Sequence, residues 1–496
     1  MADLDLKTQS EQEIKGFTRK EGFLVFLSFV AVQLSSEVIN QWGTYFYSPG
    51  EGRGRIIYVA VGLVGIIFVV GTLWDAITDP LVGSLSDRTR RHRKTRNFLF
   101  IEGKRRPFIF WGSILLMIPS IAFWYPPVAS QSTANLVYGT IMLCLQWTML
   151  TLIAVPLAAL TLDIAKSETD RVKIGTWVAL GFIIGLAIAN ALTGVFIELL
   201  DTAREGEVTS PVGYRRIVII YSMLSLAFFQ FLVWGIKERS AESFREENER
   251  NDSLIRGLSS AVKNRAFGPY FIAFVLFMAG VLAVQRILPY WAELGLGGKE
   301  STVTFLMVPY ILFALISYVF IPSLARRLHV KWMIILAFFI ICTGLPMIYV
   351  VCVSKFSTSA RLIMGALVFA YCGIGQGIMY VMQTPLLGEI IDYDEFQSGR
   401  KREALYNGLH GVANKVSMAV SIVVATQSMS IWGNSVDNFN GVLYVGLIAG
   451  ILALLGIVIM LFYPGHAKTT AVKGALRRCQ DRRGPHQPSA GRTPFH

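Results

Sequence analysis

The chain has 496 residues, of which 53% are hydrophobic and only 16% are charged, and its mean hydropathy is +0.51. This composition is too apolar for a soluble globular protein and predicts an integral membrane protein. The net charge of +13 is concentrated in short loops between apolar segments, so it indicates membrane topology rather than nucleic-acid binding. The five cysteines show no paired short spacing, which predicts neither a disulfide framework nor a zinc site.

Apolar runs of about 18 or more residues predict twelve membrane-spanning helices, and hence an all-α membrane protein. The predicted spans are roughly 21–47, 56–86, 107–127, 133–163, 174–200, 215–236, 267–291, 302–325, 330–353, 361–391, 403–432 and 439–463. Basic clusters follow the second, fourth, eighth and tenth spans. The positive-inside rule therefore predicts that the even-numbered loops and both termini are cytoplasmic.

The distribution of charge also divides the chain. Residues 237–266 are mostly polar and charged, and they are predicted to link a six-helix bundle at 21–236 to a second bundle at 267–463. Residues 1–20 lack the pattern of a cleaved signal peptide and are predicted to be a cytoplasmic segment. The basic tail, residues 464–496, is predicted to be disordered.

The most informative stretch is WDAITDPLVGSLSDR, residues 74–88, which places two acids inside an apolar run. Asp75 and Asp79 are four residues apart, so they and Thr78 lie on one face of a helix. Counting back from Arg88, Asp75 is about 20 Å deep, near the centre of the bilayer. Buried acids need a cation, a proton or a basic partner, and oxygen ligands suit Na⁺ or a proton. The alternative is a helix-packing role, with Asp79 capping the chain before Pro80.

Other polar side chains inside the predicted spans are expected to face a substrate cavity. Gln376, Tyr380 and Gln383 share one helical stripe, and Lys415 is a buried charge that needs a carboxylate partner unless it extends to the interface. The remaining candidates are Glu37, Gln41, Trp42, Tyr45, Gln146, Gln285, Arg286, His410 and Asn414. Hydrogen bonding between helices is the alternative role for each of them.

Three sequence blocks carry a resemblance to a known family. Gly83-x-x-x-Asp87-Arg88 resembles the loop signature of the major facilitator superfamily, whose acid and base form a cytoplasmic latch. WDAITDPLVGSLSDRTR, GKRRPFIFWGS (103–113) and EIIDYDEFQSGRKREALYNG (389–408) resemble the glycoside-pentoside-hexuronide:cation symporter family, which includes melibiose permease. The resemblance implies the major facilitator fold, with twelve helices in two six-helix halves.

The resemblance also implies roles for individual residues. The cation-site acids fall on Asp75 and Asp79, the hydroxyl ligand of helix 4 on Thr151, and the essential lysine of helix 11 on Lys415. Two features of the sugar-transporting members are missing: Ala154 stands where they have an acid, and residues 175–182 contain no arginine. The same pattern resembles the more distant sodium-dependent lysophosphatidylcholine symporters.

The expected function is therefore symport of a sugar or glycoside with Na⁺ or H⁺ by alternating access, with a Na⁺-coupled lysophospholipid symporter using Lys415 for the head group as the alternative. The chain contains no GxSxG, HExxH or P-loop motif, so an enzyme is not expected. The expected partners are a small solute, the coupling cation and the lipid bilayer. No cofactor, no metal beyond Na⁺ and no nucleic acid are expected, and the protein is expected to be a monomer of the cell membrane.

Overall fold

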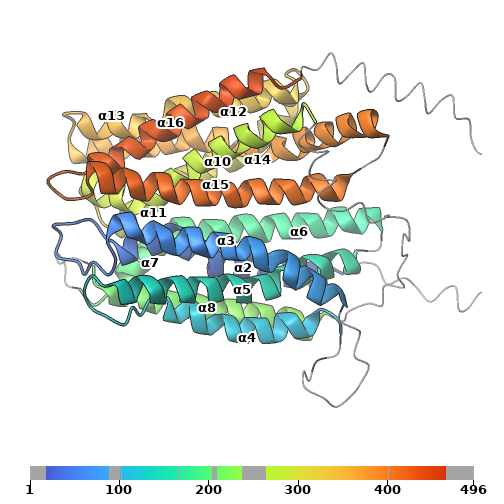
Figure 1. Cartoon of the computed structure of the whole chain (residues 1–496), viewed down its shortest axis with the longest axis horizontal. Helices are drawn as coiled ribbons and strands as arrows, with labels where there is room; N and C mark the ends of the chain where they lie inside the picture. The colour runs from blue at the N-terminus through green and yellow to red at the C-terminus, as the bar shows by residue number, and fades with distance from the viewer. Residues whose placement is uncertain are drawn as a thin grey trace, which may run out of the picture.

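The structure is a computed structural model that describes residues 18–88, 101, 103–165, 167–203, 209–236, 264–399 and 402–464. Most of these residues are helical (Figure 1). The first group of helices is α2 (Arg19–Tyr47), α3 (Val61–Arg88), α4 (Arg106–Ala122), α5 (Thr133–Ile164), α6 (Glu168–Ala187), α7 (Thr193–Leu199) and α8 (Pro211–Gly235). The second is α10 (Phe267–Tyr290), α11 (Glu300–Ala325), α12 (Val330–Gly344), α13 (Met347–Val353), α14 (Thr358–Ser398), α15 (Glu403–Trp432) and α16 (Asn440–Leu461). Two short π-helical turns, η1 (Ile188–Leu192) and η2 (Trp291–Gly295), join α6 to α7 and extend α10.

The helices form two halves, which lie one above the other in Figure 1: α2 to α8 in the N-terminal half and α10 to α16 in the C-terminal half. Within the described residues, eleven helical segments are long and apolar enough to cross a membrane. The remaining predicted span is α4, which has 17 residues and lies at the short end of what crosses a bilayer. The prediction of an all-α membrane protein is confirmed.

Several predicted spans have boundaries that differ from the observed helices, and three of the differences have a clear local cause. The span predicted at 56–86 begins only at Val61, because a loop at 48–60 contains Gly52 and Gly54 with φ of +88° and +76°. The span predicted at 107–127 ends at Ala122, and the following Pro126-Pro127 pair cannot continue a helix. The span predicted at 330–353 is divided into α12 and α13, and Pro346 lies at the break.

The two halves contact each other closely at one end of the bundle. We call this the outer end; it holds the loops 48–60 and 433–438, and the predicted topology places it outside the cell. Here α3 packs against α15 through glycine: a Cβ on Gly62 would lie 2.6 Å from Ser430 Oγ. The loops also pair across the halves, since Glu51 N donates to Asn434 O over 3.1 Å and Val436 N donates to Glu51 O over 3.0 Å. The halves are thus closed against each other at the outer end.

Several predicted features fall largely outside the described residues. These are the segment 1–20 up to residue 17, the linker 237–266 up to residue 263, and the tail 464–496 from residue 465. The predicted latch also falls largely outside what the structure describes, because the side chains of Asp87 and Arg88 are not among the described ones. Its third member, Gly83, lies on α3, where an added Cβ would have only Val155 nearby, at 3.9 Å.

Candidate functional site

Two acids of α3 meet a lysine of α15 where the two halves contact each other. Lys415 Nζ lies 2.7 Å from Asp75 Oδ2 and 2.5 Å from Asp79 Oδ2. On α5, Thr151 Oγ1 lies 3.0 Å from Asp75 Oδ1 and 3.0 Å from Asp79 Oδ1. Thr78 contributes differently, because its hydroxyl donates to the backbone carbonyl of Asp75 over 3.2 Å. The structure therefore joins Asp75, Asp79, Thr151 and Lys415 in one cluster, which we call the cation cluster.

The cation cluster is one positive charge short of neutrality, and its hydroxyl group has too few hydrogens for both of its carboxylate neighbours. With every group ionised, two carboxylates face one ammonium group, which leaves a net charge of −1. The Thr151 hydroxyl carries a single hydrogen, so it donates to only one of its two carboxylate neighbours at a time. The side chains of Asp75, Asp79 and Lys415 are 23%, 40% and 20% exposed. One proton or one monovalent cation would neutralise the cluster, and the exposure gives it access.

A second polar region, the inter-half pocket, is a cavity of about 190 Å³. Side chains from both halves line it, from α2, α6 and η1 on one side and from α10, α11, α12 and α14 on the other. Its acid is Glu37, which accepts hydrogen bonds from Asn190 and Gln285 over 3.4 Å each. Polar side chains that line it include Gln33, Gln376 and Tyr380. Aliphatic residues of α6, α10, α11 and α12 and the rings of Phe182 and Phe369 form most of the rest. Amides beside aromatic rings suit an uncharged solute that carries hydroxyl groups.

Arg286 connects these two regions. It follows Gln285 on α10 and is 4% exposed. Its Nη1 donates to Asn40 O on α2 over 2.9 Å, its Nε lies 3.4 Å from Ser421 Oγ on α15, and its guanidinium lies over the Phe68 ring on α3 at 5.2 Å. One buried side chain thus contacts a helix of the pocket and two helices of the cation cluster.

Several of the remaining predicted residues lie away from the pocket. Gln146 Nε2 donates to Ser35 O over 2.9 Å, and its Oε1 accepts from Ser120 over 2.8 Å, which is the helix-packing role left open for it. His410 Nδ1 lies 2.7 Å from the Tyr270 hydroxyl, and Asn414 Nδ2 lies 3.3 Å from His410 Nε2. Gln41 is fully buried without a hydrogen-bond partner for its amide, and Gln383 is half-buried on α14.

Trp42 and Tyr45 are among the residues predicted to face the substrate cavity, but the structure places them at the outer end. Both are fully buried, and their rings pack edge to face at 6.3 Å. The Tyr45 hydroxyl donates to Glu293 Oε2 over 2.5 Å. Glu293 and its neighbours Arg55 and Glu300 are not recognisable as a site from the sequence, because all three lie at or near the ends of predicted spans and resemble ordinary loop charges.

The fold and these two regions define the class of protein: a membrane transporter with the major facilitator fold. Residues 27–465 match the family described as MFS/sugar transport protein, and the chain belongs to that family. The predictions of fold and family are confirmed.

Individual relatives are distant. YagG of Escherichia coli (strain K12), which has a provisional name as a glycoside/cation symporter, is 25% identical over 76% of this chain and 75% of its own. Sodium-dependent lysophosphatidylcholine symporter 1 of Gallus gallus is 22% identical over 80% of this chain and 79% of its own. The solved structure of a D-xylose-proton symporter has a TM-score of 0.61 and 13% identity, and the alignment covers 91% of this chain and 98% of that one.

Proposed function

We propose that the protein is a secondary active symporter that moves a sugar or glycoside together with one Na⁺ or H⁺. The observation that carries the proposal is the cation cluster, where a single ammonium group lies between two carboxylates at 2.7 and 2.5 Å. Such a cluster in a membrane is stabilised by one further positive charge. The solute would occupy the inter-half pocket, where rocking of the halves exposes it to each side in turn.

Lys415 acts in this mechanism as an internal cation. A Na⁺ ion bound by Asp75, Asp79 and Thr151 competes with the ammonium group for the same carboxylate oxygens, so binding of the ion weakens the contacts that join α15 to α3. Arg286 contacts both of these helices and α2, which gives a physical route from the cluster to the pocket. Coupling of this kind is reciprocal: if the ion raises the affinity for the solute, the solute raises the affinity for the ion by the same factor.

The alternative solute is a lysophospholipid, and the relative from Gallus gallus is the observation that favours it. Lys415 would then bind the phosphate of the head group. Two carboxylates already neutralise Lys415, so a phosphate would have to displace them. The four amides that line the inter-half pocket suit the hydroxyl groups of a sugar, and the apolar residues that make up most of its lining suit an acyl chain, so the uptake experiment decides between the two solutes.

Uptake by proteoliposomes distinguishes between a glycoside and a lysophospholipid as the transported solute. Purified protein is tested with a panel of radiolabelled glycosides and with lysophosphatidylcholine, each with and without an inward Na⁺ gradient at fixed pH, and then with an inward proton gradient. We expect at least one glycoside to accumulate and one of the gradients to stimulate it. Accumulation of the lysolipid alone would overturn the proposal.

We also propose that the protein acts as a monomer in the cell membrane with both termini in the cytoplasm. The basic clusters after even-numbered spans support this orientation. A cysteine introduced at Phe356, which is 57% exposed between α13 and α14, should react with an impermeant maleimide added to intact cells. Failure to react, with labelling only after lysis, would reverse the topology.

A further inference from the structure

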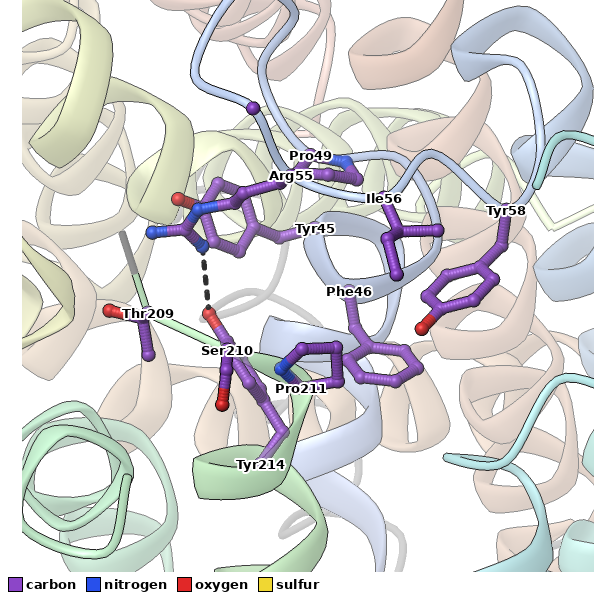
Figure 2. A pocket seen from close by; sticks show the side chains of 11 residues that line it. Tyr45, Phe46, Pro49, Arg55, Ile56, Tyr58, Thr209, Ser210, Pro211 and Tyr214 are labelled. Atoms are coloured by element: carbon purple, nitrogen blue, oxygen red, sulfur yellow. Dashed lines mark hydrogen bonds between the residues drawn. The ribbon is translucent and has the colours of Figure 1, made fainter. Parts of the chain in front are cut away.

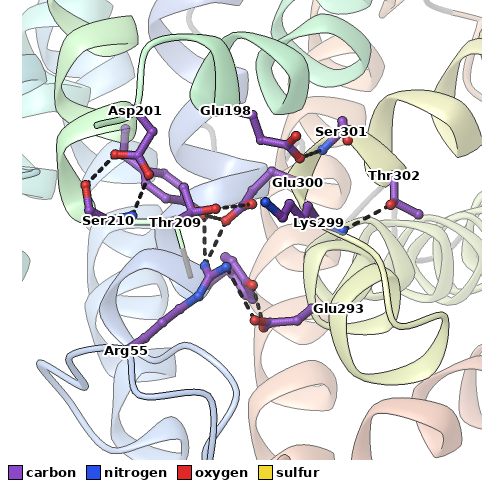
Figure 3. A network of polar contacts seen from close by, with 12 residues as sticks. Arg55, Glu198, Asp201, Thr209, Ser210, Glu293, Lys299, Glu300, Ser301 and Thr302 are labelled. Carbon is purple, nitrogen blue, oxygen red and sulfur yellow. Dashed lines mark hydrogen bonds and ion pairs between the residues drawn. The ribbon is translucent and has the colours of Figure 1, made fainter. Parts of the chain in front are cut away.

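Two acids of the C-terminal half are buried at the outer end, apart from the cation cluster. Glu293 lies in η2 and Glu300 begins α11, and their side chains are 6% and 1% exposed. Figure 3 shows both carboxylates directed toward Arg55, which projects from the loop 48–60 of the N-terminal half. Arg55 Nη1 lies 2.8 Å from Glu300 Oε1, and Nη2 lies 3.3 Å from Glu293 Oε1.

The other donors to these acids also come from the N-terminal half. Glu300 accepts from the Tyr214 and Thr209 hydroxyls over 2.7 Å each, and Glu293 accepts from the Tyr45 hydroxyl over 2.5 Å. Two carboxylates of one half are therefore inserted among donors of the other half. Separation of the halves at this end would break all five contacts together.

The burial of these charges makes the network depend on its geometry. A carboxylate removed from water is costly unless a cation and hydrogen bonds replace its hydration, and loss of one partner leaves the other charge buried and unpaired. Burial lowers the pKa of Arg55, but Tyr45, Tyr214, Glu300 and Glu293 raise it more, so its pKa is above the ordinary value and it stays charged. Arg55 also lines an outer cavity of about 240 Å³ beside Tyr58 and Pro211 (Figure 2), so water can reach the network from this side once the halves move.

An independent contact shows how tightly the halves meet here. A Cβ built on Gly194 of α7 would lie 2.1 Å from the backbone carbonyl oxygen of Glu300. This is a contact of backbone with backbone, so no side-chain movement could make room for a methyl group. Glycine at this position allows α7 and α11 to approach closely enough for Glu300 to reach its donors.

We propose that Arg55 is the residue that holds the outer gate of the transporter closed, and that the gate opens only when Arg55 separates from Glu293 and Glu300 together. The gate then has one cation shared by two acids. The backbone pairing of Glu51 with Asn434 and Val436 adds contacts that do not depend on any side chain. Loss of Arg55 should therefore shift the population toward the outward-open state without removing the closed state.

The test measures the gate itself and needs no transported solute, so its outcome is independent of the proposed function. Spin labels are placed through Val128→Cys and Phe356→Cys, which are 36% and 57% exposed in outer loops of the N- and C-terminal halves, in a full-length protein whose five native cysteines are replaced. Double electron–electron resonance then gives the distance distribution between the labels. The variants are Arg55→Gln, Arg55→Lys and Glu300→Ala.

We expect Arg55→Gln to raise the ratio of long to short distances by about tenfold or more, because it leaves two buried acids without their cation. Arg55→Lys should shift the ratio less, since lysine keeps the charge but lacks the paired donors of the guanidinium. The control is Arg216→Gln, whose guanidinium donates to Leu200 O within its own half. An Arg55→Gln distribution that matches wild type would overturn the proposal. If that variant does not fold, an unchanged distribution in Glu300→Ala, which removes three of the contacts, would overturn it equally.

Discussion

The outer gate and the cation cluster are built from the same chemical groups, two carboxylates and one basic side chain that cross from one half to the other. They differ in the burial of the acids and in the number of hydroxyl donors that the acids receive. At the gate the acids are 6% and 1% exposed and receive hydroxyl donors in addition to Arg55. In the cation cluster the acids are 23% and 40% exposed and share one hydroxyl. The gate acids are buried and held by hydroxyl donors as well as Arg55, whereas the more exposed carboxylates of the cluster leave access for the cation that we propose binds there.

The largest effect is expected from removal of the internal cation. Lys415→Ala leaves two adjacent carboxylates without an ammonium group, so gradient-driven uptake should fall by about 100-fold or more. Initial rates of uptake into proteoliposomes measure this. Lys355→Ala, at an exposed turn between α13 and α14, is the control and should transport normally. Undiminished uptake by Lys415→Ala would assign the lysine to packing.

Variants of the two regions should differ in how Na⁺ changes the thermal stability of the protein. A cation that binds only the folded protein stabilises it by about 2.7 kcal/mol at 100 times its Kd. If Na⁺ is the coupling ion, wild type and Glu300→Ala should both show this increase in thermal stability with NaCl relative to choline chloride, and Asp79→Asn should lose it. Loss of the Na⁺ response in Glu300→Ala but not in Asp79→Asn would reverse the assignment of the two regions.

Steric opening of the gate should lower transport less than loss of Lys415. Gly194→Val forces α7 away from α11, so we expect uptake to fall by about tenfold, because the state closed to the outside becomes rare. Gly411→Ala on α15 is a matched control, since an added Cβ there would meet nothing within 4 Å. The two variants are compared by uptake rate and by the outer spin-label distance.

The smallest effect on transport is expected at Gln146, whose amide joins α5 to α2 and α4. Gln146→Leu leaves the Ser35 carbonyl and the Ser120 hydroxyl without this partner, which should lower the free energy of unfolding by about 1–3 kcal/mol. Thermal denaturation of the purified protein detects this loss. The cation concentration that gives half-maximal uptake should stay unchanged, and a large shift in it would place Gln146 in the transport pathway.

The two acids of the cation cluster could be predicted from the sequence because they are close together along one helix. Asp75 and Asp79 are four residues apart in one apolar helix, so their shared face follows from helical periodicity, and the resemblance added Thr151 and Lys415. The outer gate could not be predicted in this way. Arg55, Glu293 and Glu300 come from a loop, a π-helical turn and the first residue of a helix, and only the packing of the two halves brings them together. Trp42 and Tyr45 show the same limit, since nothing in the spacing of α2 distinguishes a pocket face from a gate face.

The proposed symport requires the cation cluster to bind one monovalent cation. Isothermal titration of purified protein with NaCl, in buffers of different ionisation enthalpy, counts the Na⁺ bound and the protons displaced, and it requires no knowledge of the solute. We expect one exchangeable cation per chain in wild type and in the exposed control Asp437→Asn, and none in Asp75→Asn or Asp79→Asn. Binding of the same stoichiometry and affinity in either cluster variant would contradict it.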